Sequence, residues 1–239
     1  YITFRLLDFA DLTVDGSIAT GAAVSVMLIR AGVSPIATLP IAFLAGALAG
    51  MVTGLLNTAL GIPGILASIL TQISLYSINL NIMGKANQPV SVDNYPLVVS
   101  LRYVTDGSVS RLLFFLGMIV FLLALIAVMY WYFGSEQGHA IRATGCNSNM
   151  ARAQGINTNF IKVLALMISN GLVGLCGALY GQFQGASDVN MGRGAIVIGL
   201  AAVIIGEVLF GKFASKRKLA FAFTLASVIL GAVIYYMVY

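Results

Sequence analysis

The chain has 239 residues, of which 59% are hydrophobic and only 9% are charged, and its mean hydropathy is +0.97. Soluble domains average about 25% charged residues, so this composition excludes an ordinary soluble protein and predicts an all-α protein that crosses a membrane several times. The net charge is +5, but the basic residues stand in short clusters between apolar runs. Such clusters are typical of membrane topology signals and argue against nucleic-acid binding.

Residues 7–17 contain three acidic side chains and Gly16, which favours a break in the backbone, so they predict an interrupted helix. Asp11 or Asp15 is expected to cap the helix that follows, because a carboxylate at a helix N-terminus accepts hydrogen bonds from unpaired backbone N–H groups. A carboxylate on a transport pathway is the second interpretation. The chain begins at Tyr1 and ends inside an apolar run, so we expect residues 1–239 to be one transmembrane domain trimmed at both ends.

Seven apolar segments are expected to enter or cross the membrane, some of them short or broken. They are residues 17–29, 36–60, 65–83, 112–133, 163–182, 195–210 and 219–239. The sixth is shorter than the roughly 20 residues that a span needs, so we expect it to be tilted or partly re-entrant.

The second and third segments carry the small and polar residues of interest. Gly46, Gly50 and Gly54 recur at intervals of four and predict a face on which another helix packs closely. Polar side chains within the apolar segments predict a translocation path, with hydrogen bonds between helices as the alternative. The predicted path residues are Asn57, Ser68, Gln72 and, in the fifth segment, Asn170.

A basic turn at residues 211–218 holds Lys212, Lys216, Arg217 and Lys218 and is predicted to be cytoplasmic by the positive-inside rule. Counting spans back from it places residues 61–64 and 135–159 inside, and residues 85–110 and Asp188 outside. Arg30 then lies outside as a tolerated exception. Glu207 is expected to pair with Lys212, and a mechanistic carboxylate is the alternative.

Residues 135–159, SEQGHAIRATGCNSNMARAQGINTN, are the longest stretch without a sustained apolar run. They predict two short helices, the first ended by Gly145 and the second by Gly155. A structured basic loop in an otherwise apolar chain indicates contact with a soluble partner, and a merely solvated loop is the alternative.

Two stretches, residues 11–23 and 188–202, share an order of features: an aspartate, a glycine break and a short apolar run. By the topology above they cross the membrane in opposite directions, which is the pattern of an inverted repeat whose broken helices flank a transport path. Chance similarity between common residue types is the alternative.

The run GHAIRATGCNSNMARAQGIN, followed by ISNGLVGLCGALYGQ and GASDVNMGRGAIVIGLAAVIIGE, resembles the permease subunits of bacterial ABC importers of the branched-chain amino acid and ribose type. DLTVDGS is similar to the early signature of a subgroup described as uncharacterised or aromatic amino acid permeases. The resemblance covers nearly the whole chain and is most specific in the polar loop. There the matching residues are Ala140, Arg142, Ala143, Gly145, Asn147, Ala151 and Gly155.

This resemblance implies a multi-pass subunit of the bacterial cytoplasmic membrane that forms the pathway for a small polar solute, with an amino acid favoured. It implies a second permease subunit, identical or different, an external substrate-binding protein, and an ATPase subunit that docks on residues 135–159. The chain lacks the GxxxxGK[ST] phosphate loop, so we expect it to bind no cofactor and its partner to hydrolyse ATP. The predicted ATPase contacts are the seven matching loop residues and Arg152, with Ala143 and Gly145 as close-packing positions.

Two other classes stay open from the residues alone. A secondary transporter would need an ion site, and no cluster of intramembrane carboxylates is evident beyond Glu207 and the early aspartates. An intramembrane enzyme is weaker, because the single histidine, His139, lies in the polar loop with no catalytic partners. No spacing typical of metal ligands is present, and Cys146 and Cys176 are expected to be free thiols.

Overall fold

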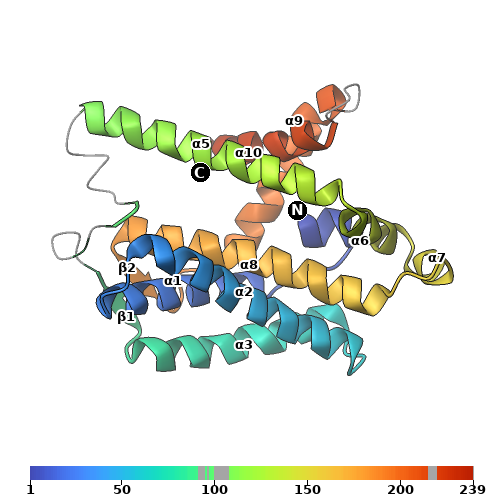
Figure 1. Ribbon diagram of the computed structural model, residues 1–239, viewed down its shortest axis with the longest axis horizontal. Coiled ribbons are helices and arrows are strands. Elements are labelled where there is room, and N and C mark those ends of the chain that lie inside the picture. Colours follow the sequence, from blue (N-terminus) through green and yellow to red (C-terminus); the bar gives the residue numbers. More distant parts are fainter. Residues whose placement is uncertain (91–94, 96, 100–107, 215–219, 239) are drawn as a thin grey trace.

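The computed structural model describes residues 1–90, 95, 97–99, 108–214 and 220–238, and most of them lie in helices (Figure 1). The long helices are α1 (Val14–Arg30), α2 (Pro35–Thr58), α3 (Gly64–Met83), α5 (Ser108–Phe133), α8 (Thr158–Gln184), α9 (Ala195–Ala214) and α10 (Ala220–Val238). The short elements are the π-helix η1 (Ile2–Leu6), α6 (Glu136–Cys146), α7 (Ser148–Ala153), and the strands β1 (Asn87–Pro89) and β2 (Ala186–Asp188).

Five helices among the described residues are long and apolar enough to cross a membrane. They are α2, α3, α8, and the parts Phe114–Phe133 of α5 and Phe221–Val238 of α10. Helix α1 has 17 residues and the apolar part of α9 is Ala195–Leu209, so both are shorter than a full span of about 20 residues. A helical membrane protein with several spans therefore fits, but the predicted number of seven is not confirmed.

Helices α1, α2, α3 and α8 form a bundle whose tightest contacts are made by glycine. A Cβ atom added to Gly46 would lie 2.2 Å from the carbonyl oxygen of Asn170, and one added to Gly50 would lie 2.2 Å from that of Leu166. At Gly54 the added atom would lie 2.9 Å from the Cα of Val163. The stripe of small residues on α2 therefore faces α8 along its length, which is the close approach that such spacing permits.

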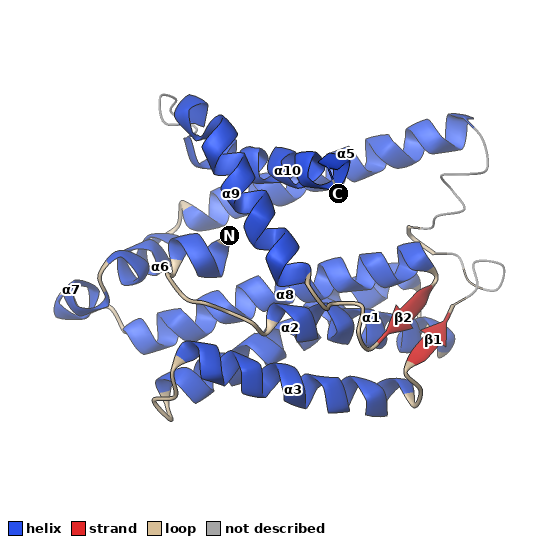
Figure 2. Ribbon diagram, turned by 180° about the vertical axis from the view of Figure 1, so that it is seen from behind, coloured by secondary structure: helices blue, strands red, loops and turns tan. Residues whose placement is uncertain are grey.

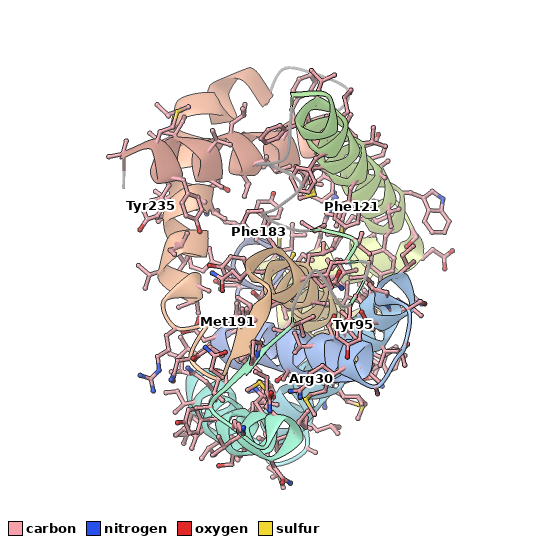
Figure 3. All side chains as sticks on the ribbon, turned by 90° about the vertical axis from the view of Figure 1, so that its left-hand side faces the viewer. Arg30, Tyr95, Phe121, Phe183, Met191 and Tyr235 are labelled. Atoms are coloured by element: carbon pink, nitrogen blue, oxygen red, sulfur yellow. The ribbon has the colours of Figure 1, made fainter. Side chains whose placement is uncertain are left out.

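Helices α5 and α10 lie in a separate layer above this bundle. Only 6% of the α5 span and 11% of the α10 span is buried, against 39% for α2 and 44% for α8. Figure 2 shows α9 crossing from the bundle to this layer. Figure 3, viewed from the β1–β2 side, shows Phe121 of α5 and Tyr235 of α10 in the layer and Arg30 in the bundle. Most of the α5 surface is therefore left for lipid or another chain.

The loops gather at two ends of the bundle. At the β1–β2 end, the two strands pair antiparallel, with Asn87 opposite Asp188, and the Arg30 side chain donates a hydrogen bond to Gln88. At the α6–α7 end lie η1, the turn between α2 and α3, and α6. This sorting agrees with the predicted topology, but the prediction of an all-α chain missed the strands, which are too short to show alternation. Residues 91–94, 96, 100–107 and 215–219, which include Lys216, Arg217 and Lys218 of the basic turn, lie outside the described residues.

Helices α1 and α9 meet at the ends where they begin. The Asp15 carboxylate, in the first turn of α1, accepts hydrogen bonds from the backbone N–H groups of Gly194 (3.2 Å) and Ile196 (3.1 Å), where α9 begins. A Cβ atom added to Gly192 would lie 1.9 Å from the Asp15 carbonyl oxygen, so the backbone at Gly192 approaches that of Asp15 too closely for any residue but glycine. From this point α1 runs to the β1–β2 end and α9 to the α6–α7 end, as an inverted repeat requires. The repeat itself stays a prediction.

Glu207 on α9 is bonded to Arg5 of η1, whose Nε lies 2.9 Å from the carboxylate. The sequence predicted Lys212 as the partner, but the side chain of Lys212 lies outside the described residues. Arg5 is 202 residues away in the chain, so no local sequence pattern could indicate this pair. The hydrogen bond with Glu207, followed by its charge, raises the pKa of the Arg5 guanidinium, so that group stays charged. The pair ties the start of the chain to α9.

Candidate translocation and coupling sites

The non-helical segment 7–13 enters the bundle beside Asn170 of α8. Asp11 accepts hydrogen bonds from the Thr13 backbone N–H at 2.9 Å and from Asn170 Nδ2 at 2.7 Å. The Ser17 hydroxyl donates to Asn170 Oδ1 at 2.7 Å, and Asn170 Nδ2 also donates to the Leu166 carbonyl. All three side chains of this network, those of Asp11, Ser17 and Asn170, are buried. Asn170 therefore lies in the packed core, where it joins α8 to the helix break.

A cavity of about 370 Å³ lies on the other side of the α1 start, between α3 and the segment that precedes α9. Asp15 and Arg193 supply opposite charges, and the remaining polar groups are amides and hydroxyls. Its lining residues are Asp15, Gly16, Gln72, Ile73, Tyr76, Ser77, Asn79, Val189, Asn190 and Arg193.

Asn79 is the most telling residue of this cavity, because its side chain is fully buried while neither its Nδ2 nor its Oδ1 has a hydrogen-bond partner among the described residues. Leaving a buried polar group unpaired costs about 1–3 kcal/mol, and native proteins rarely leave such groups without a role. The cavity therefore presents a donor and an acceptor to whatever polar molecule enters it.

The structure brings one of the four predicted path residues, Gln72, to this cavity. The Ser68 hydroxyl donates to the carbonyls of Gly64 and Ile65, and Asn57 donates to Ile62 at 2.8 Å in the turn between α2 and α3. The sequence did not single out five polar lining residues: Tyr76, Ser77, Asn79, Asn190 and Arg193. Asp15, for which a transport pathway was the second interpretation, also lines the cavity. Spacing could have found part of the set, because Gln72, Tyr76 and Asn79 share one helix face.

The polar segment 135–159 contains two short helices, α6 and α7, but Gly145 does not end the first one. Helix α6 continues to Cys146, and a Cβ atom added to Gly145 would lie 2.0 Å from the Leu6 carbonyl oxygen. Close packing on η1 therefore explains this glycine. The second helix is capped by Asn147, whose Oδ1 accepts hydrogen bonds from Asn149 and Met150 at 3.1 and 3.0 Å. Gly155, with φ of +86°, follows its end.

The eight predicted contact residues do not share one surface. Asn147, Arg152 and Gly155 are exposed, Ala151 is buried, and Ala140, Arg142, Ala143 and Gly145 are half-buried. Arg152 donates to the Thr158 hydroxyl at 3.0 Å, whereas the guanidinium of Arg142 lies over the Phe221 ring, 4.3 Å from its centre. The exposed surface centres on α7 and adds Met150, which is 59% exposed and was not selected from the sequence.

Comparison with known proteins shows the family of the chain. Residues 1–239 match the family model described as "Branched-chain amino acid transport system / permease component". The chain belongs to this family. No solved structure gives a significant match to this permease.

Three relatives show the range of the similarity. The permease is 41% identical to the "Tyrosine transport system permease protein" of Clostridioides difficile over 213 residues, 89% of this chain and 68% of that protein. It is 35% identical to "Uncharacterized protein RP368" of Rickettsia prowazekii over 210 residues, 88% and 71% of the two chains. It is 26% identical to the "Inner membrane ABC transporter permease protein YjfF" of Escherichia coli, over 87% and 62%. The family and the apolar helices together make this permease a multi-pass inner membrane protein.

Proposed function

We propose that this permease is the membrane subunit of an ATP-driven importer and that the cavity around Asn79 lies on its translocation path. The observation that carries the proposal is the position of this unsatisfied amide beside the point where the first turns of α1 and α9 meet. Broken helices at matching positions flank the substrate site in many transporters. The opposite charges of Asp15 and Arg193 suit the ammonium and carboxylate groups of an amino acid, and the similarity to a tyrosine transport permease favours that substrate class.

The energy for transport is proposed to arrive through the α6–α7 end. The chain has no phosphate-binding loop, so a separate ATPase subunit would hydrolyse ATP and contact the exposed surface of α7. Helix α6 can pass on a displacement because its close contact with η1 at Gly145 couples it to the break before α1. A second permease subunit and an external substrate-binding protein, the latter at the β1–β2 end, complete the proposed assembly.

The coupling contact can be tested at Met150, because it is exposed and its side chain does not support a neighbouring helix. Met150→Asp should reduce the ATPase subunit that co-purifies with the tagged permease, and the substrate-stimulated ATP hydrolysis of the complex, by about tenfold. The reason is that a carboxylate buried in an interface costs more than the 1.4 kcal/mol that a tenfold loss requires. A bulky residue at Gly145 would test coupling less cleanly, since it would also displace η1.

The matched control is Ala31→Asp, an exposed position in the turn at the β1–β2 end, which should retain the ATPase subunit. Full retention and normal ATP hydrolysis with Met150→Asp would place the contact elsewhere. Uptake that follows an ion gradient, with no ATPase subunit bound to the wild-type protein, would instead indicate a secondary transporter.

A further inference from the structure

A second cavity, distinct from the one around Asn79, opens at the α6–α7 end where α5 ends and α10 begins. Its volume is about 530 Å³. Aromatic rings dominate its wall, and its basic residues come from α6. The lining residues are Tyr130, Trp131, Phe133, Gly134, Ser135, His139, Arg142 and Phe221.

Arg142 is held in this cavity without an acceptor for its buried Nε. The guanidinium stacks over Phe221, with 4.3 Å to the ring centre, and lies 5.9 Å from the centre of Phe133. Its Nε is buried and has no hydrogen-bond partner among the described residues. The side chains of Arg5, Arg30 and Arg152 each donate to an oxygen of the protein, so Arg142 differs from them.

Among the described residues, no carboxylate is paired with this guanidinium. Glu207 is bonded to Arg5 instead. A planar guanidinium fixed by two rings is suited to bind the oxygens of a phosphate. His139, three residues earlier on α6, is exposed and adds a second nitrogen donor on the same side of that helix.

The residues around the cavity are those expected at the depth of the lipid headgroups. Trp131 is 77% exposed and Tyr130 is 42% exposed, and both lie in the last turn of the apolar span of α5. Tryptophan and tyrosine concentrate at the membrane–water interface, and basic pockets between helices on the cytoplasmic side bind lipid headgroups. A water-soluble ligand would not need this belt.

We infer that the cavity binds the phosphate of an anionic phospholipid from the adjoining leaflet, with Arg142 as its main ligand and Trp131 against the glycerol region. Bound lipid would join α5, α6 and α10, whose direct contacts in the protein are few. This site is independent of the proposed transport function, because it depends neither on the cavity around Asn79 nor on the ATPase subunit.

Trp131 is the only tryptophan in the chain and reports on the cavity directly. The test reconstitutes the full chain in vesicles of phosphatidylcholine that contain a minor fraction of brominated phosphatidylglycerol or, for comparison, of brominated phosphatidylcholine. The wild-type protein should show quenching that corresponds to an about fivefold enrichment of phosphatidylglycerol next to Trp131, which is the effect of about 1 kcal/mol for one basic residue. Arg142→Gln should abolish this preference, and Arg142→Lys should restore part of it.

Arg152→Gln is the matched control and should keep the preference, because its guanidinium donates to Thr158 outside the cavity. Thermal unfolding of each variant shows whether it has folded. Equal quenching by the two brominated lipids in the wild-type protein would overturn the inference. So would a change in Trp131 emission on adding inorganic phosphate to pure phosphatidylcholine vesicles, which would indicate free phosphate. Release of the ATPase subunit by Arg142→Gln with the lipid preference intact would also overturn it and assign Arg142 to that partner.

Discussion

Two polar regions lie on either side of the start of α1, and they differ in whether their buried amide groups have hydrogen-bond partners. On one side, Asn170 donates to Asp11 and Leu166 and accepts from Ser17, so its amide is fully used. On the other side, Asn79 is equally buried, and its amide has no partner among the described residues. Burial and polarity alone therefore do not mark a transport path. Under the proposed function, the unused hydrogen-bonding capacity of Asn79 distinguishes the path from the packed core.

The difference follows from what each region must do. Segment 7–13 is not helical, so its polar groups need partners inside the protein, because a bilayer supplies none. Asn170 and Asp11 supply such partners and lock the break to α8. Asn79 lies on a regular helix whose backbone is already satisfied, so under the proposed function its amide can bind a passing solute.

The largest effect is expected for Asn170→Leu. Interhelical hydrogen bonds in membrane proteins contribute about 0.6 kcal/mol on average and up to about 1.7 kcal/mol, and this change removes two of them. It also leaves Oδ2 of the buried Asp11 carboxyl group and the buried Ser17 hydroxyl without their partner, so we expect a loss of about 2–3 kcal/mol in the free energy of unfolding. Unfolding in detergent, followed by circular dichroism, measures it.

Asn81→Leu provides the matched control, since it makes the same substitution at an exposed position of α3 and should change stability by less than about 0.5 kcal/mol. If Asn170→Leu lowers the free energy of unfolding no more than the control does, the network does not hold the helix break in place. The structural role that distinguishes Asn170 from Asn79 would then be wrong.

A smaller effect, and one on transport rather than stability, is expected for Asn79→Leu. Replacing an unpaired buried amide by an apolar group of similar shape is nearly neutral or stabilising, so the unfolding free energy should stay level or rise. Uptake of radiolabelled amino acid by cells with the complete system should fall about tenfold, the loss that one hydrogen bond of about 1.4 kcal/mol would cause. Normal uptake, or a clear loss of stability, would show that Asn79 serves helix packing and does not line the path.

Much of the fold could be predicted from the sequence, because apolar runs, glycine spacing and basic turns are local signals. The break before α1, the close face of α2 and the two short helices of segment 135–159 all appear in the structure. The strands do not follow from the sequence, since three residues are too few for a pattern. In the part of the chain that the structure describes, five helices rather than seven have the length and composition of a span, because α1 and the apolar part of α9 are too short.

The site was harder to predict because its parts are far apart in the chain. Gln72 was selected for its polarity in mid-span, but Arg193 joins it only through the return of the chain before α9. Asn170 is, like Gln72, an amide side chain within an apolar helix, and only the structure shows that its hydrogen bonds are used. Gly145 resembled a helix stop, since a local pattern cannot show that Leu6 packs against it.

The smallest effect is expected at Asn57, whose polarity also suggested a path. Its amide donates to the Ile62 carbonyl at 2.8 Å and so closes the turn between α2 and α3 at the α6–α7 end, away from the lining of the cavity around Asn79. Asn57→Ala should therefore cost about 0.6 kcal/mol, the average for such a bond in a membrane protein, and leave amino acid uptake unchanged. Gln72→Leu, measured beside it, should lower uptake with little change in stability. If Asn57→Ala reduces uptake as much as Gln72→Leu does, satisfied polar groups also serve transport, and unused hydrogen-bonding capacity is not the mark of the path.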